Sequence, residues 1–225
     1  MPLSHAVVQF TNFCRRFGLG RPRDAVLSPA WKRYAETLDG LASHDARVRW
    51  TQDVFRRSPR ETLPPGQKRF GCFSVDPPDE SGVVRIHFGN HDRDGTSPLA
   101  PAKIAKRRRE LTRMFGWMRA THPGACEVRG TSWLYDRESY RRLFPLEYVA
   151  AREVLRRTPS LQGSSRWGQF LDARGAVKAD LRDRFRDNLK SFEMDRMWAV
   201  FPLPTYSVRA PIEVFYRFYL SAQRL

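Results

Sequence analysis

The sequence contains only three cysteines among 225 residues, and they stand far apart, at Cys14, Cys72 and Cys126. None belongs to a Cys-x-x-Cys pair, which argues against a disulfide framework. Cys72 and Cys126 lie within apolar runs, which predicts buried structural thiols. A chain of this length buries enough surface to fold without disulfides or metal ions.

Long apolar segments are also missing. The best apolar run extends from Met197 to Leu203, well short of the roughly 18 residues that a membrane span needs. The N-terminus lacks the basic region and long apolar segment of a secretory signal. We therefore expect a soluble, cytoplasmic protein with no membrane partner. With 41% hydrophobic and 28% charged residues, the composition is globular rather than collagen-like, coiled-coil or disordered.

Lysine is scarce, because 34 of the 40 basic residues are arginines. The formal net charge is +16 and the isoelectric point is about 10.6, a range in which nucleic-acid binding must be considered. The planar guanidinium also suits phosphates and carboxylates on small ligands. A GC-rich genome gives the same arginine bias, so a functional basic patch and plain surface charge both remain open.

Known catalytic and nucleotide-binding signatures are missing as well. The sequence has no Walker A loop, no Gly-x-Gly-x-x-Gly fingerprint and no Gly-x-Ser-x-Gly elbow around Ser132. Nucleotide binding through those loops is therefore not predicted, and the reaction and cofactor stay undetermined.

Hydrophobic spacing predicts helices in the N-terminal part, residues 1–58. One amphipathic helix is expected over Ser4–Phe17, and a second begins at Pro29 after an N-cap at Ser28. Gly40 and Ser43 should break the second helix, which resumes through Trp50 to Phe55. A loop is expected over 59–66.

A strand pair and a β-α-β crossover are predicted for residues 69–135. The strands Phe70–Val75 and Val83–Phe88 should pair antiparallel. A helix from Ser97 to Thr121 then leads to a strand at Cys126–Arg129, which should lie parallel to the strand before the helix.

Residues 136–225 are expected to hold helices and a final strand pair. The predicted helices are Asp136–Phe144, Leu146–Arg157 and Ala176–Phe192, and the predicted strands are Met197–Phe201 and Ile212–Leu220. The last segment also fits a helix through Ile212, Phe215, Tyr216 and Tyr219. The chain is therefore predicted to be one α/β domain, 1–225, with a mixed sheet, and an α+β arrangement is the alternative.

This order of helices and strands resembles that of the acetyltransferase fold of the GNAT superfamily. The likeness is one of topology and covers much of the chain. It implies an acyltransferase-like activity. The superfamily's phosphate-cradling turn, with a Gly-x-Gly or Gly-x-Ala arrangement, is absent from Gly89–Ala102.

The predicted site lies where the two parallel strands end, since ligands of open α/β sheets bind beyond the carboxyl ends of such strands. We take His91, Asp92 and Ser132 as candidate catalytic residues, with His91 as general acid or base because imidazole titrates near neutral pH. The candidate ligand-binding residues are His87, Asn90, Arg107, Arg108, Arg129, Trp133 and Tyr135. The expected partner is a small anionic ligand.

Two alternatives concern the same rim. His87 and His91, four positions apart, could hold a metal ion with Asp92 and Asp94, but a polar turn explains the segment better and no metal site is predicted. Trp133 and Tyr135 could instead anchor the following helix through Tyr140, Leu143 and Phe144.

The helix after Ser97 carries arginines at the edge of its apolar face. Helical geometry puts Arg107 and Arg108 beside the apolar stripe and leaves Arg109 and Glu110 solvated. A half-buried arginine needs an internal carboxylate such as Asp92, or a bound anion. Nucleic-acid binding through Arg107–Arg109 is the rival hypothesis, and a non-catalytic interaction protein is a third.

Overall fold

A computed structural model describes residues 29–57, 66–92, 94–156 and 164–221. Contacts divide the chain into two compact units, which we call the N-terminal unit (1–62 with 159–163) and the sheet unit (63–158 with 164–225). The helix predicted at Ser4–Phe17 and most of the loop predicted over 59–66 lie outside the described residues.

The N-terminal unit contains the predicted pair of helical segments, α4 (Pro29–Gly40) and α5 (His44–Arg57). Proline opens α4, where its fixed φ costs nothing, and the chain breaks after Gly40 as expected. Trp31, Tyr34 and Leu38 are buried between the helices. The Tyr34 ring stacks on Trp50 with centroids 6.4 Å apart.

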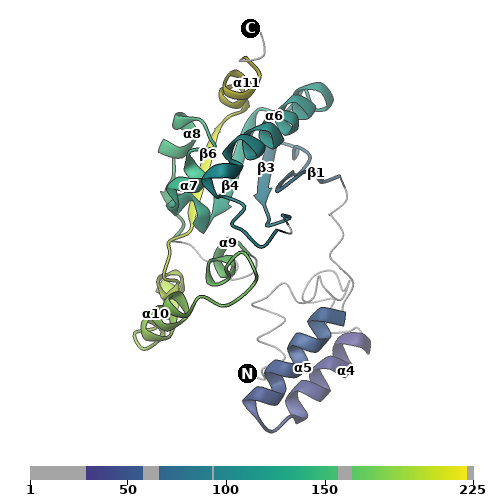
Figure 1. Cartoon of the computed structure of the whole chain (residues 1–225), viewed down its shortest axis with the longest axis vertical. Helices are drawn as coiled ribbons and strands as arrows, with labels where there is room; N and C mark the ends of the chain where they lie inside the picture. Colours follow the sequence, from purple (N-terminus) through teal and green to yellow (C-terminus); the bar gives the residue numbers. More distant parts are fainter. Residues whose placement is uncertain (1–28, 58–65, 93, 157–163, 222–225) are drawn as a thin grey trace. The chain divides into compact units, whose positions relative to one another are not determined.

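The sheet unit is built on a six-stranded mixed sheet, which confirms the predicted α/β class (Figure 1). In spatial order the strands are β1 (Lys68–Phe70), β2 (Phe73–Val75), β3 (Val83–Phe88), β4 (Glu127–Ser132), β6 (Tyr206–Pro211) and β5 (Glu153–Val154). Only β3 and β4 are parallel, and every other neighbouring pair is antiparallel.

The predicted crossover joins the parallel strands. A short 3-10 turn, η1 (Pro101–Lys103), precedes α6 (Ile104–Thr121), which ends where the sequence indicated. The predicted strand Phe70–Val75 is in fact two strands, β1 and β2. Gly71 makes the turn between them at φ +63°, a conformation that side chains with a Cβ rarely adopt.

One face of the sheet is covered and the other is exposed. Val84 and Val128 face a core shared with α6, α7 (Glu138–Arg141), α8 (Leu146–Ala150) and α11 (Ile212–Leu220). On the opposite face Arg85, Arg129 and Arg209 are exposed and stand in one cross-strand row. This half-covered arrangement is common where strands run antiparallel.

Several C-terminal predictions were wrong. Ile212–Leu220 is the helix α11 and not a strand, because Phe215 and Tyr219 stack on Phe115 of α6 at helical spacing. Met197–Phe201 falls in a 3-10 segment, η4 (Met194–Val200).

Three helix predictions were also too long, and the strands β5 and β6 were missed. The helix predicted at Asp136–Phe144 is limited to α7. Leu146–Arg157 is helical only to Ala150 and then enters β5, and the helix predicted at Ala176–Phe192 is α10 (Ala179–Leu189). The sequence analysis missed β6, which pairs with β4 over its whole length. The remaining short helices are η2 (Trp133–Asp136), α9 (Ser164–Trp167) and η3 (Gly168–Phe170).

Candidate functional site

The parallel strands β3 and β4 pair over only half of their length. Their register runs from Val83 opposite Glu127 to Arg85 opposite Arg129 and stops there, although each strand continues for three more residues. β4 keeps its pairing with β6 over all six residues. The carboxyl ends of β3 and β4 therefore diverge, at the rim where the sequence predicted a site.

The loop after β3 carries the predicted His87, Asn90 and His91. His87 is exposed on the open sheet face, and its Nε2 lies 2.9 Å from the Asp76 carboxylate. His91 turns back over Gly89, and its pKa is lowered by burial and by the nearby Arg69 charge. His91 is consequently neutral at pH 7 and able to accept a proton.

A segment from far along the chain closes over this rim. Asn90 Nδ2 donates to the Ala173 carbonyl oxygen at 2.9 Å, which joins the loop after β3 to the turn before α10. Lys178 Nζ lies 5.4 Å from the centroid of the Trp133 ring and donates to the Gln169 carbonyl at 3.0 Å. Figure 1 shows α9 beyond the ends of the strands.

Lys178 is a site residue that sequence reasoning missed. Burial and the nearby Arg137 charge lower the pKa of its amine, and such shifts are enriched at functional sites. The Trp133 ring gives the ammonium a cation–π partner. The one signal in the sequence that could have pointed to Lys178 was the scarcity of lysine, which occurs at only six positions in this arginine-rich chain.

Tyrosine hydroxyls line the core side of the point where the strands separate. Tyr135 and Tyr148 hydroxyls are 2.8 Å apart, and a Cβ on Gly130 would overlap both of them. Gly130 is the first residue of β4 after its pairing with β3 ends. Tyr140 also hydrogen-bonds Tyr135, and burial raises the pKa of all three phenols well above 10.0. They are neutral donors at physiological pH.

The aromatic surroundings of Tyr135 confirm the anchoring alternative for that residue. Its ring packs against Tyr140 and Phe144 at centroid distances of 5.1 and 6.1 Å, and it is 1% exposed. Tyr135 therefore belongs to the core, and only its hydroxyl is directed at the rim strand β4.

Arg107 and Asp92 form a buried charge cluster at the start of α6. Arg107 Nη2 lies 3.1 Å from Asp92 and 3.1 Å from Glu110, and Asp92 also accepts from Lys103 and Lys106. Burial alone raises the pKa of Asp92, but these three cations lower it far below its ordinary value. Arg107 thus has an internal carboxylate partner, one of the two possibilities left open by the sequence.

Glu110 was expected to be solvated, and that prediction was wrong. Its carboxylate accepts from the Cys72 backbone N–H at 3.1 Å, and its side chain is 10% exposed. Burial raises its pKa above 4.5, although the Cys72 and Arg107 contacts lower it. The buried face of α6 is therefore wider than the apolar stripe alone.

The other predicted site residues are spread over different surfaces. Ser132 Oγ accepts from the Leu134 N–H and caps η2. Arg129 pairs with Glu127 on the open sheet face, and exposed Arg108 donates to the Arg142 carbonyl at 3.4 Å. Asn90 and Trp133 contact the segment that holds Lys178, through the Ala173 carbonyl and the Lys178 ammonium. His91 instead lies over Gly89 and near Arg69 of β1.

Metal and thiol chemistry receive no specific support. Within the described ranges, no three His, Cys, Asp or Glu side chains come together as a metal site requires. Cys72 is buried as predicted, but Cys126 is exposed, because it lies just before the amino end of the central strand β4. Its Sγ donates to the Ser81 carbonyl at 3.2 Å. Cys14 lies outside the described residues.

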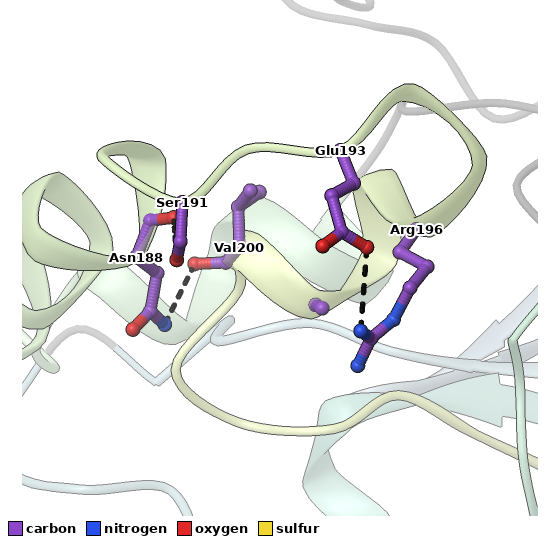
Figure 2. A pocket seen from close by; sticks show the side chains of 6 residues that line it. Asn188, Ser191, Glu193, Arg196 and Val200 are labelled. Atoms are coloured by element: carbon purple, nitrogen blue, oxygen red, sulfur yellow. Dashed lines mark hydrogen bonds and ion pairs between the residues drawn. The ribbon is translucent and has the colours of Figure 1, made fainter.

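A cavity of about 210 Å³ lies elsewhere, between α10 and η4 (Figure 2). It is lined by Asn188, Ser191, Glu193, Arg196, Ala199 and Val200. Its polar groups are satisfied by one another: Arg196 Nη1 donates to Glu193 at 3.3 Å and Asn188 to the Val200 carbonyl at 3.2 Å. The sequence analysis did not single out these residues.

No protein-family model, no curated protein and no solved structure matches this chain. In the part of the chain that the structure describes, no helix has both the length and the apolar character to cross a membrane.

Proposed function

We propose that the sheet unit binds a small anionic ligand along the diverging ends of β3 and β4 and acts as a transferase of acyltransferase-like topology. The observation that carries the proposal is the early end of the β3–β4 register at Arg85 and Arg129. Strand edges that do not pair with each other can pair with the amides of an extended ligand, as in β-strand addition.

The polar groups of the rim support an acyl transfer. His91 is neutral at pH 7 and suits the removal of a proton from an attacking amine or hydroxyl. The Tyr135–Tyr148 hydroxyl pair lies on the core side of Gly130 and supports the rim from behind, so His91 also serves as the acid that returns the proton to the leaving group. In this scheme the new acyl bond forms as the bond to the leaving group breaks, and the proton that His91 removes from the attacking group passes to the leaving group, which restores neutral His91.

The cations at the start of α6 limit the choice of acyl donor. Lys103, Lys106 and Arg107 already donate to Asp92, so they are not free to hold a diphosphate. We therefore favour a donor held by strand backbone and by the Lys178–Trp133 pair over one held by phosphate at the α6 N-terminus. Coenzyme A thioesters become the less favoured class.

A thermal-shift comparison tests the proposal. The probes are S-acetylglutathione, a phosphate-free acetyl thioester that carries two carboxylates on an extended peptide, and acetyl coenzyme A, both at millimolar concentration. Binding to the folded state at five times Kd stabilises by about 1 kcal/mol, which raises Tm by a few degrees. We expect the phosphate-free thioester to give this shift.

Lys178→Met should remove the shift, and Lys190→Met is the matched control, because Lys190 is exposed and pairs with Asp187 away from the rim. If neither thioester raises Tm, or if Lys178→Met responds like the control, the proposed site is wrong.

A further inference from the structure

The outward face of α6 is a continuous stripe of positive charge. Lys106, Arg109 and Arg113 are exposed and follow one another at spacings of three and four residues. Glu110 is the only acidic residue of the helix, and it is buried against Arg107 and Cys72. The exposed side of α6 therefore carries no negative charge.

Arg109 and Arg113 make no ion pair or hydrogen bond with any part of the chain that the structure describes. They lie one turn apart, where like charges destabilise a helix by a few tenths of a kcal/mol. Three exposed positions near these arginines are alanines: Ala102, Ala105 and Ala120. A flat, bulky partner could therefore approach the helix closely.

We propose that this face of α6, which we call the α6 basic face, binds the phosphate backbone of a nucleic acid. Lys106 already pairs with Asp92, so the phosphate contacts fall to Arg109 and Arg113. These two lie about 6 Å apart along the helix axis, a separation that suits two neighbouring phosphates of one strand. The net charge of +16 would steer such a polyanion toward the protein. This surface differs from the one expected from sequence, since Arg107 is buried and Arg108 bonds to the Arg142 carbonyl.

The chemistry of the α6 basic face favours nucleic acid over a lipid surface. A helix that lies on a membrane needs large apolar side chains beside its basic ones. None of the large exposed hydrophobic residues among the described residues lies on α6. Contacts to phosphates alone carry no sequence information, so the binding is not sequence-specific.

Fluorescence anisotropy with a labelled 20-base-pair DNA duplex tests the proposal across salt concentrations from 50 to 200 mM. The test variant is Arg109→Gln with Arg113→Gln. The control is Arg182→Gln with Arg186→Gln, which removes two exposed arginines at the same spacing from α10. Both double variants lower the net charge equally, so nonspecific attraction cancels in the comparison.

We expect the test variant to bind the duplex about tenfold to a hundredfold more weakly at 50 mM salt. The slope of log K against log salt should fall by about 2, because two phosphate contacts are lost. The control should leave the slope unchanged. Equal losses in both variants, no loss in either, or binding to anionic vesicles without binding to the duplex would each overturn the proposal. The Lys178→Met variant should bind the duplex normally, which keeps this result independent of the rim.

Discussion

Arg107 Nη2 lies 3.1 Å from the Asp92 carboxylate, and the two side chains are 1% and 7% exposed. This contact fastens the loop after β3 to the first turns of α6. It links the candidate rim to the helix that carries the basic face.

Replacing Asp92 with Asn should destabilise the sheet unit by about 3 kcal/mol, because it leaves Arg107 buried with one carboxylate fewer. Asp94→Asn should cost far less, since the Asp94 side chain is 54% exposed. Urea unfolding followed by circular dichroism measures both values. Equal effects of the two substitutions would show that the buried pair contributes little.

Acid should destabilise the fold through the same cluster. The pKa of Asp92 is depressed, and hydrogen bonds from Lys103 and Thr96 lower that of Asp94 from 3.8 to about 2. These carboxylates stabilise the folded state above pH 4, and that contribution disappears as pH falls through their folded pKa values. Glu110 has the opposite sign, because burial raises its pKa above 4.5.

Unfolding free energies measured from pH 5 to pH 2 should therefore fall less steeply in Asp92→Asn with Asp94→Asn than in the unmodified protein. Parallel curves for the two proteins would contradict this assignment.

The helix α11 offers a test of packing. Phe215 is fully buried against Phe115 and Tyr148, whereas Phe218 is 42% exposed on the same helix. Phe215→Ala should cost about 3–5 kcal/mol and Phe218→Ala below about 1. If Ile212–Leu220 were a strand, Phe218 would be buried on the same face as Ile212 and Val214. A larger loss of unfolding free energy for Phe218→Ala than for Phe215→Ala would therefore favour the strand.

This segment also shows where sequence reasoning reaches its limit. Ile212–Leu220 is apolar at alternate positions and at helical spacing, so both periods fit, and only the partners Phe115 and Tyr148 decide between them. The strand before it, Tyr206–Pro211, was missed because it has only Val208 and Ala210 as buried residues and ends in proline.

The crossover was easier to predict, because its signals are local. A short run of residues that favour strands indicated Val83–Phe88, and the long amphipathic pattern of α6 ended at Thr121 before the turn at Pro123 and Gly124. The position of the rim could be predicted from that topology. The position of Lys178 could not be predicted, since it lies beside Trp133 through a tertiary contact between segments 45 residues apart in sequence.

A substitution at Gly130 tests the packing at the point where β3 and β4 separate. Gly130→Ala should destabilise the fold by about 1–3 kcal/mol, because the added methyl group overlaps the Tyr135 and Tyr148 hydroxyls. Tyr135→Phe removes one hydroxyl and should recover part of that loss when the two changes are combined. A double-mutant cycle of unfolding free energies measures the coupling. Strict additivity would mean that the hydroxyls do not touch this residue.

The turn between β1 and β2 is completed by a residue 38 positions away, because the Cys72 N–H donates to Glu110 of α6. A hairpin of two three-residue strands has too few contacts to persist alone in water. The β1–β2 hairpin therefore gains its turn hydrogen bond only after α6 has packed against it. This edge of the sheet is expected to form late in folding. Formation of the crossover is therefore expected to precede formation of this edge.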